Sequence, residues 1–101
     1  MASLHYDISV RIEPENPVPG GWVDVVAELR NVTGEIRSVQ VSIAEHDYFL
    51  TLQPRGENTF TTRAFVPWEA DPGQYVATVW GVSTSGDPGP RLRVPVHVKA
   101  R

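Results

Sequence analysis

Apolar and polar residues alternate along most of this chain, in short segments separated by turn-forming residues. In residues 4–12 every second residue is apolar, and the residues between them are polar or charged. Because successive side chains of a β-strand point to opposite faces, this period of two predicts a strand with one buried face. Comparable segments predict further strands at about residues 22–30, 36–44, 48–52, 59–66, 74–80 and 91–99. No window of helical length has a period of 3.6, so the chain is predicted to be all-β.

Proline and glycine mark the ends of these strands. The segment 13–21 contains three prolines and two glycines, and 81–90 is rich in Ser, Gly, Asp and Pro. Because proline cannot donate to a β-ladder and glycine adopts positive φ, both segments are predicted to be turns or loops. The segment 31–35 is predicted to be a turn as well. Its Asn31-Val32-Thr33 glycosylation pattern is interpreted as turn chemistry, since Asn is favoured in turns.

Seven short strands with a turn about every eight to twelve residues are typical of a sandwich of two antiparallel sheets. A closed barrel is the alternative. Pro95 in the last strand, together with the charges of the two terminal strands, is more typical of sheet edges than of a sealed barrel.

The inward-facing positions of four predicted strands define one contiguous core. Its members are Val25, Ala27, Leu29, Val39, Val41, Ile43, Tyr75, Ala77, Val79, Val94 and Val96. A slip of one residue would turn a whole apolar set toward solvent. The prediction therefore requires Val39 and Val79 to be buried, and Gln40 and Thr78 to lie on the other face.

A Pro-Gly turn opens the segment 71–81, and strict alternation follows it. The spacing Asp71-x-Gly73-x-Tyr75 resembles the tyrosine corner of immunoglobulin-like sandwiches, in which a Tyr near the start of strand F bonds back to the E–F turn. The resemblance implies that the Tyr75 ring lies in the core and that its hydroxyl bonds to the backbone near residues 67–70.

Length, composition and charge exclude several classes of protein. The 101 residues are long enough for one domain, and the apolar fraction of 41% with 21% charged residues is ordinary for a globular protein. A net charge of −3 without a Lys/Arg cluster predicts no nucleic-acid partner. No apolar run reaches the roughly 20 residues of a membrane span, so no membrane insertion is expected. The absence of cysteine excludes a disulfide and a zinc–thiolate site.

The first residues have no basic segment followed by an apolar run, so no signal peptide is predicted. An initiator Met directly before a strand suggests that residues 1–101 are a single module excised from a larger multidomain protein. A small intracellular protein is the alternative interpretation.

Titratable residues form no recognisable catalytic or metal-binding pattern. His5 and His97 fall on outward positions of the terminal strands, and no His-x-His or His-x-x-x-His spacing exists. Glu45-His46-Asp47 is a dense polar cluster, but consecutive strand residues point to opposite faces, so it is predicted to be a polar strand break. The chain also lacks a nucleophile elbow and a phosphate-binding loop before a helix. We expect no catalytic residue, no metal, no cofactor and therefore no enzyme.

The tryptophans are the strongest functional candidates. Trp68 is followed by Glu69 and Asp71, and Trp80 is out of phase with the core positions of its strand. Sugars stack on exposed indole rings while neighbouring carboxylates bind their hydroxyl groups, so Trp68, Trp80, Glu69 and Asp71 are the predicted ligand-binding residues. The alternative is that the tryptophans cover the ends of the sandwich as large apolar plugs.

The order of these features resembles bacterial immunoglobulin-like modules of the fibronectin-III and "Big" type. The matching features are the Pro-rich turn 14–20, the Val-Asp-Val-Val-Ala strand, the middle strand 36–43, the Pro-Gly-x-Tyr corner and the Val-alternating last strand. The resemblance implies a disulfide-free, immunoglobulin-like antiparallel two-sheet sandwich that acts as a spacer or protein-interaction domain in a bacterial surface or secreted protein. The implied partners are neighbouring domains of the same chain, another protein or a glycan. The alternative function is a carbohydrate-binding accessory module of a polysaccharide-active enzyme.

Overall fold

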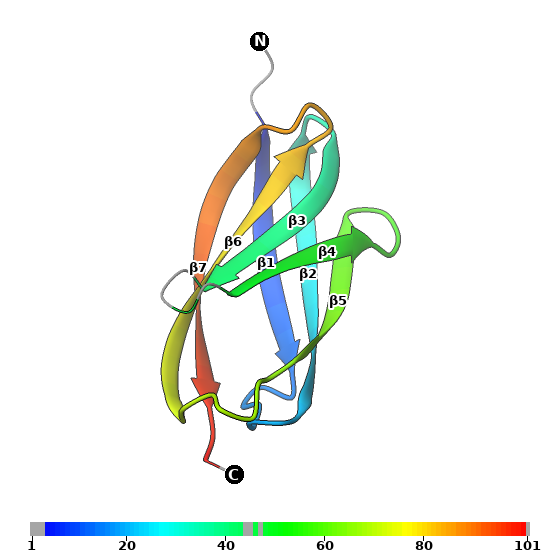
Figure 1. Ribbon diagram of the computed structural model, residues 1–101. Coiled ribbons are helices and arrows are strands. Elements are labelled where there is room, and N and C mark those ends of the chain that lie inside the picture. Colours follow the sequence, from blue (N-terminus) through cyan, green and yellow to red (C-terminus); the bar gives the residue numbers. More distant parts are fainter. Residues whose placement is uncertain (1–3, 44–45, 47, 101) are drawn as a thin grey trace.

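All seven regular elements among the described residues are β-strands (Figure 1). The computed structural model describes residues 4–43, 46 and 48–100. The strands are β1 (His5–Glu13), β2 (Trp22–Thr33), β3 (Ile36–Ile43), β4 (Tyr48–Pro54), β5 (Thr59–Phe65), β6 (Gly73–Ser83) and β7 (Pro88–Val98). Every predicted strand is therefore present, with ends that differ from the predicted ones by a few residues. No helix of the described residues is long and apolar enough to span a membrane.

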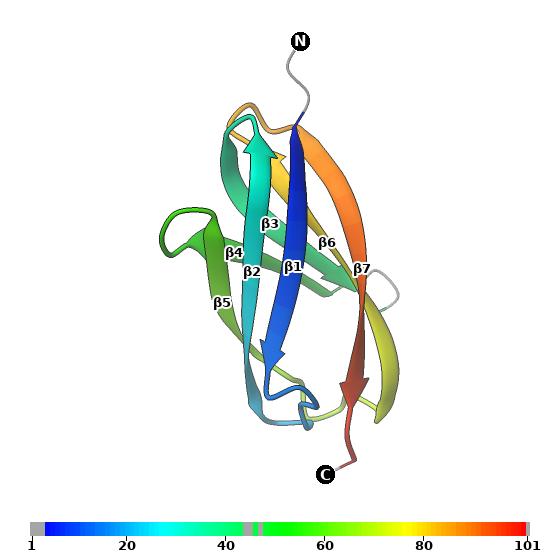
Figure 2. The ribbon, with the colours of Figure 1, turned by 180° about the vertical axis from the view of Figure 1, so that it is seen from behind.

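The strands form one antiparallel sheet in the order β1-β2-β5-β4-β3-β6-β7. The sheet curves until its two end strands, β1 and β7, lie side by side and run in the same direction (Figure 2). Among the described residues no ladder joins β1 to β7, so the sheet is nearly closed rather than closed.

The prediction of two separate sheets is not confirmed. β4 pairs with β3 from Tyr48 to Leu52, and then its last residues, Gln53 and Pro54, pair with β5. This link of two residue pairs joins the group β1-β2-β5 to the group β3-β6-β7 and makes the sheet continuous. The sequence did not reveal the link because β4 has no feature that marks a change of partner.

The predicted strand phases are confirmed. Val39 and Val79 are only 0% and 1% exposed, whereas Gln40 and Thr78 are half-buried on the other face. Ten of the eleven predicted core residues lie in the core cluster or pack against it, and the exception is Tyr75. Leu52 and Phe60 are buried members of the cluster that the prediction did not include.

Two predicted turns are shorter than expected. Strand β2 continues to Thr33, and Asn31 occupies a bulge opposite β1 with φ of 52° while its side-chain amide donates to Asp7. Asn tolerates this left-handed conformation better than most residues, so Asn31 serves a strand bulge rather than the predicted turn. The predicted loop 81–90 is a tight hairpin, in which the Ser83 backbone N–H donates to the Asp87 carbonyl.

The Tyr6 side chain connects β1 to the opposite end of the sheet. Its hydroxyl donates to the Pro90 carbonyl and accepts a hydrogen bond of 2.7 Å from the Gly81 backbone N–H. The pairing register of β6 and β7 shifts between Trp80 and Val82, so Gly81 lies in an irregularity of that ladder. A Cβ on Gly81 would be 3.0 Å from the Tyr6 ring, so a larger residue there would require the ring to shift by a few tenths of an ångström. Tyr6 thus holds the unpaired edges together near the start of β1.

Candidate functional site

A cavity of about 350 Å³ opens between the strands in the half of the molecule that contains the start of β4 and of β6. Side chains from all seven strands line it, together with the connection 66–71. It exists because β4 pairs with β5 only at its last two residues, so the two strands diverge toward Tyr48. Nine valines and three alanines are among the residues that line it, and these side chains fill less volume than leucine or phenylalanine would at the same positions.

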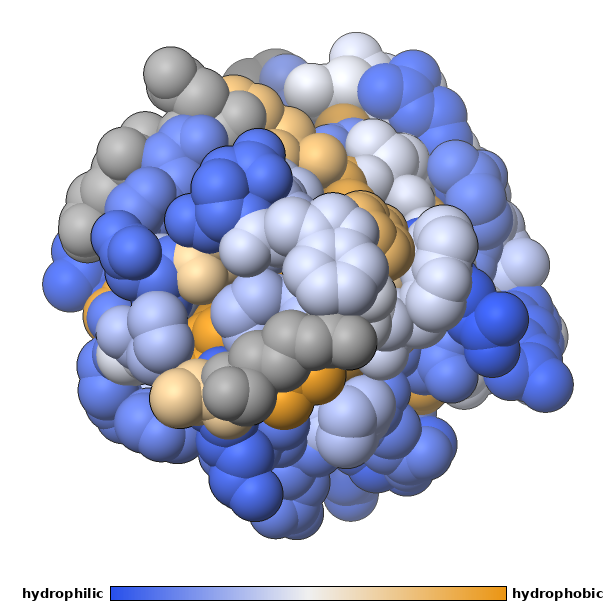
Figure 3. Space-filling model, turned by 60° about the horizontal axis from the view of Figure 1, so that its bottom comes forward, coloured by the Kyte–Doolittle hydropathy of each residue, from blue (hydrophilic) through white to orange (hydrophobic). Residues whose placement is uncertain are grey.

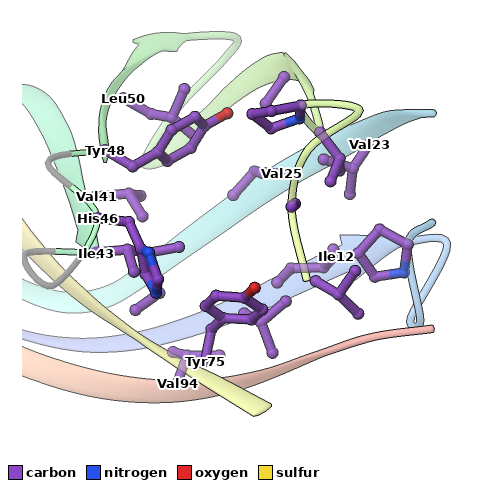
Figure 4. A pocket seen from close by; sticks show the side chains of 18 of the residues that line it. Ile12, Val23, Val25, Val41, Ile43, His46, Tyr48, Leu50, Tyr75 and Val94 are labelled. Atoms are coloured by element: carbon purple, nitrogen blue, oxygen red, sulfur yellow. The ribbon is translucent and has the colours of Figure 1, made fainter. Parts of the chain in front are cut away.

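Two tyrosines and a histidine stand around the cavity. In Figure 4, Tyr48 of β4 and Tyr75 of β6 lie on opposite sides, with His46 between them in this view. The His46 and Tyr75 rings pack edge to face with centroids 4.9 Å apart. The Tyr48 hydroxyl donates to the Phe65 carbonyl at 3.3 Å. Burial raises the pKa of Tyr48, so this hydroxyl stays protonated and keeps donating at neutral pH.

The predicted bond from the Tyr75 hydroxyl back to the preceding turn is present. The hydroxyl donates to the carbonyl of Asp71, next to the predicted range 67–70. The ring is half-buried and lines the cavity rather than joining the core cluster. Tyr75 therefore fixes the turn that precedes β6 and at the same time shapes the cavity wall.

The structure separates the predicted sugar platform into two parts. Glu69 and Asp71 line the cavity and are exposed, so they lie at its opening. Trp68 does not line the cavity, although it is 60% exposed. Its ring lies on Gly20, where a Cβ would come within 2.6 Å of the ring. Neighbouring residues of this connection therefore face different surfaces.

Trp80 lies far from the other predicted site residues. It is half-buried on the outer face of β6, and the Arg91 guanidinium lies 5.2 Å from its ring centroid. Trp80 lies seven positions after Gly73 in the strand, which corresponds to about 23 Å at the rise of an extended strand. Trp80 and Trp68 therefore do not form one stacking surface.

The sequence prediction did not anticipate the surroundings of Trp22. This side chain is 61% exposed, and its ring packs edge to face on Phe65, its cross-strand partner. The Gly20 N–H donates to the Val66 carbonyl and the Val66 N–H donates to the Gly21 carbonyl, which connects the segment before Trp22 to the segment before Trp68. The two exposed tryptophans thus belong to adjacent segments that are more than 40 residues apart in sequence. Figure 3 shows that strongly hydrophobic residues at this end of the molecule form only small patches among hydrophilic ones.

The histidines do not converge on a metal site. Within the described residues no group of three potential metal ligands exists. His5 begins β1 and His97 lies next to the end of β7, at opposite ends of these side-by-side strands (Figure 2). Glu45 and Asp47, which flank His46 in the predicted polar break, lie outside the described residues.

Comparison with known proteins identifies the fold but no family. No protein-family model and no curated protein matches this chain. Among solved structures, it resembles part of a modular endo-β-1,4-mannanase of glycoside hydrolase family 26 from Cellulomonas fimi, with a TM-score of 0.52 and 19% identity over 94% of this chain. It also resembles part of an engineered protein, with a TM-score of 0.54, 19% identity and the same coverage.

The chain spans only about a fifth of the length of each matched structure, 19% and 20% respectively. At this level of identity the likeness concerns the fold alone. The described residues thus form an all-β fold of seven antiparallel strands, and similar folds occur within two larger chains.

Proposed function

We propose that this chain is a non-catalytic immunoglobulin-like module that acts as a spacer or interaction domain within a larger secreted or cell-surface protein. The observation that carries the proposal is how much of each chain the structural matches cover. They cover nearly all of this chain but only about a fifth of each matched chain. One of these larger chains is a modular enzyme that acts on a polysaccharide. An accessory role beside other domains is the simplest function for such a unit, although fold alone does not determine function.

The immunoglobulin-like classification is supported by the strand order. In constant-type immunoglobulin domains the strands, lettered in chain order, form the sheets A-B-E-D and C-F-G. With β1 to β7 lettered in the same way, the sheet order contains the neighbours A-B-E and C-F-G, while the fourth strand, β4, pairs mainly with β3 and with β5 only at its last two residues. The Tyr75 hydroxyl, which bonds back to the turn before the sixth strand, corresponds to the tyrosine corner of these domains.

A spacer role is supported by the shape of the domain. Its dimensions are 47 × 26 × 17 Å, and β1 starts near one end of the long axis while β7 finishes near the other (Figure 1). A polypeptide that passes through this fold therefore advances by most of the length of the domain.

The spacer proposal can be tested with two spin labels at exposed end positions, His5→Cys and Lys99→Cys, because the native chain contains no cysteine. We expect a narrow distance distribution within the 47 Å long dimension. A broad distribution in the folded protein would contradict a rigid spacer. Incubation with β-mannan is expected to release no reducing sugar, and release that persists after repeated purification would contradict a non-catalytic module.

A second candidate function is carbohydrate binding at the surface that carries Trp22 and Trp68. Both side chains are about three-fifths exposed, at 61% and 60%, and adjacent segments carry them. Titration of soluble manno- and cello-oligosaccharides against tryptophan fluorescence tests this candidate. A change that disappears in Trp22→Ala and Trp68→Ala but remains in Trp80→Ala would favour it. A flat titration, which we expect, favours the spacer.

A further inference from the structure

The cavity has no role in a spacer, and it is large for a domain of this size. An engineered cavity of roughly 150 Å³ lined by apolar side chains stays dry and binds benzene. The cavity of about 350 Å³ in this protein is more than twice as large, and valine and alanine side chains form most of its wall. Such a wall offers water no hydrogen-bond partners, so an apolar group can enter without displacing well-bound water.

The opening of the cavity is polar and rich in hydrogen-bond acceptors. The Tyr48 and Tyr75 hydroxyl groups each donate their proton to a backbone carbonyl, so they can offer only lone pairs to a guest. The carboxylates of Glu69 and Asp71 add two negative charges. The described residues that line the cavity include no Lys or Arg, and His46 is the one ring nitrogen donor among them.

The apolar interior and the polar opening of the cavity are together complementary to one kind of molecule. An apolar body fits the valine-lined interior, while a group that carries several N–H donors and a positive charge fits the acceptors at the opening. A primary ammonium has three donors and no acceptor, and hydrogen bonds between charged groups are stronger than those between neutral ones. Aromatic rings such as those of Tyr48 and Tyr75 also attract a cation that lies over their faces.

We propose that this cavity is a binding site for a primary amine on an apolar body of about ten to fourteen non-hydrogen atoms, the upper size being scaled from the benzene-binding cavity. The apolar body lies between the strands, against Val25 and Val41. The ammonium lies at the opening, within reach of Glu69 and Asp71. The site is distinct from the surface that carries Trp22 and Trp68, and it does not depend on the spacer role.

The test uses three probes with the same phenylalkyl body and different ends: 4-phenylbutylamine, 4-phenylbutanol and 4-phenylbutyrate. Valine methyl resonances are recorded by NMR as each probe is titrated to millimolar concentration. We expect the methyl resonances of the cavity valines to shift when the amine is added. The amine should bind about tenfold more tightly than the alcohol, because its ammonium gains charged hydrogen bonds to the carboxylates at the opening. The carboxylate should bind more weakly than the alcohol because it is repelled by the two acidic residues.

Variants identify the site. Glu69→Gln combined with Asp71→Asn should reduce the preference for the amine over the alcohol to about threefold or less, since the charges that distinguish the probes are gone. Glu57→Gln, an exposed residue in the turn between β4 and β5, is the matched control and should leave the preference unchanged. Ala64→Leu should abolish binding of the amine and the alcohol, because the larger side chain fills the cavity. If this variant does not fold, Ala77→Val tests the same point with a smaller increase in side-chain volume.

Several outcomes would overturn the proposal. If no valine methyl shifts with any probe, the cavity does not bind apolar molecules. If the alcohol or the carboxylate binds as tightly as the amine, the ligand is not an ammonium. If folded Ala64→Leu and Ala77→Val proteins retain full amine affinity, the amine binds elsewhere.

Discussion

Replacement of Tyr6 by Phe is the sharpest test of how the sheet is held together. The substitution keeps the ring against Gly81 and Gly89 but removes the hydroxyl that joins β1 to β6 and β7. Pro90 is exposed, so its carbonyl can bond to water instead. Gly81 is buried, and its N–H in the irregular part of the ladder would lose its partner.

The expected loss of stability follows from the difference in burial between the Pro90 carbonyl and the Gly81 N–H. An unsatisfied buried N–H costs about 1–3 kcal/mol, whereas an exposed carbonyl that gains water costs little. We therefore expect Tyr6→Phe to lower the free energy of unfolding by about 2 kcal/mol. For a domain of this length that corresponds to a fall in Tm of about 8–16 °C.

The measurement is urea denaturation at pH 7, followed by tryptophan fluorescence and analysed by linear extrapolation. Tyr75→Phe is the matched control, because it removes a hydroxyl whose acceptor belongs to the exposed Asp71. This control should lose less than about 1 kcal/mol. The reasoning is refuted if Tyr6→Phe is as stable as Tyr75→Phe with an unchanged m-value.

Three further predictions concern pH, a turn and the core. Burial raises the pKa of Tyr6, and hydrogen bonding to Gly81 and the charge of Arg91 only partly oppose this rise; burial also raises the pKa of Tyr48. Below about pH 10 both tyrosines are neutral in the folded and unfolded states, so they add no pH dependence to stability there; above it the unfolded chain ionises first, and their contribution lowers stability. Denaturation curves from pH 9 to 11 should show this fall, and Tyr6→Phe and Tyr48→Phe together should flatten it. Gly20→Ala places a methyl group against the Trp68 ring at φ of 81°, so it should lower stability and change the indole emission; identical emission and stability would contradict the contact. Leu52→Ala empties a fully buried position and should cost about 2–5 kcal/mol in calorimetry or denaturation, and a cost below about 1 kcal/mol would mean that the core is not packed as described.

The strands could be predicted because their information is local. The alternation of residues 36–43 identifies the strand and the face that Val39 occupies without reference to any other segment. The seam between β1 and β7 is different. Tyr6 bonds to Gly81, 75 positions away, and neither residue has a neighbour in sequence that indicates the contact.

The candidate site could be predicted only in part for a similar reason. Glu69 and Asp71 were identified from their position close to Trp68 in sequence. Which surface each side chain faces depends on how the connection 66–71 packs against Gly20, and the sequence does not show this. The cavity is a property of volume, since it arises where β4 leaves β5 and small side chains do not fill the gap. A sequence shows which residues are small, but it does not show that they face one another.

The placement of the terminal strands has a mechanical consequence. β1 and β7 run in the same direction, and the chain enters β1 at one end of the domain and leaves β7 at the other. Tension on the two chain ends therefore acts along both strands and pulls them in opposite directions. Hydrogen bonds of antiparallel ladders lie perpendicular to the strands, so this tension loads the β1–β2 and β6–β7 ladders in shear. In shear the bonds of a ladder must yield together rather than one after another. Pulling force is therefore shared among many bonds, and the domain would resist extension far better than a hairpin that is opened from its end.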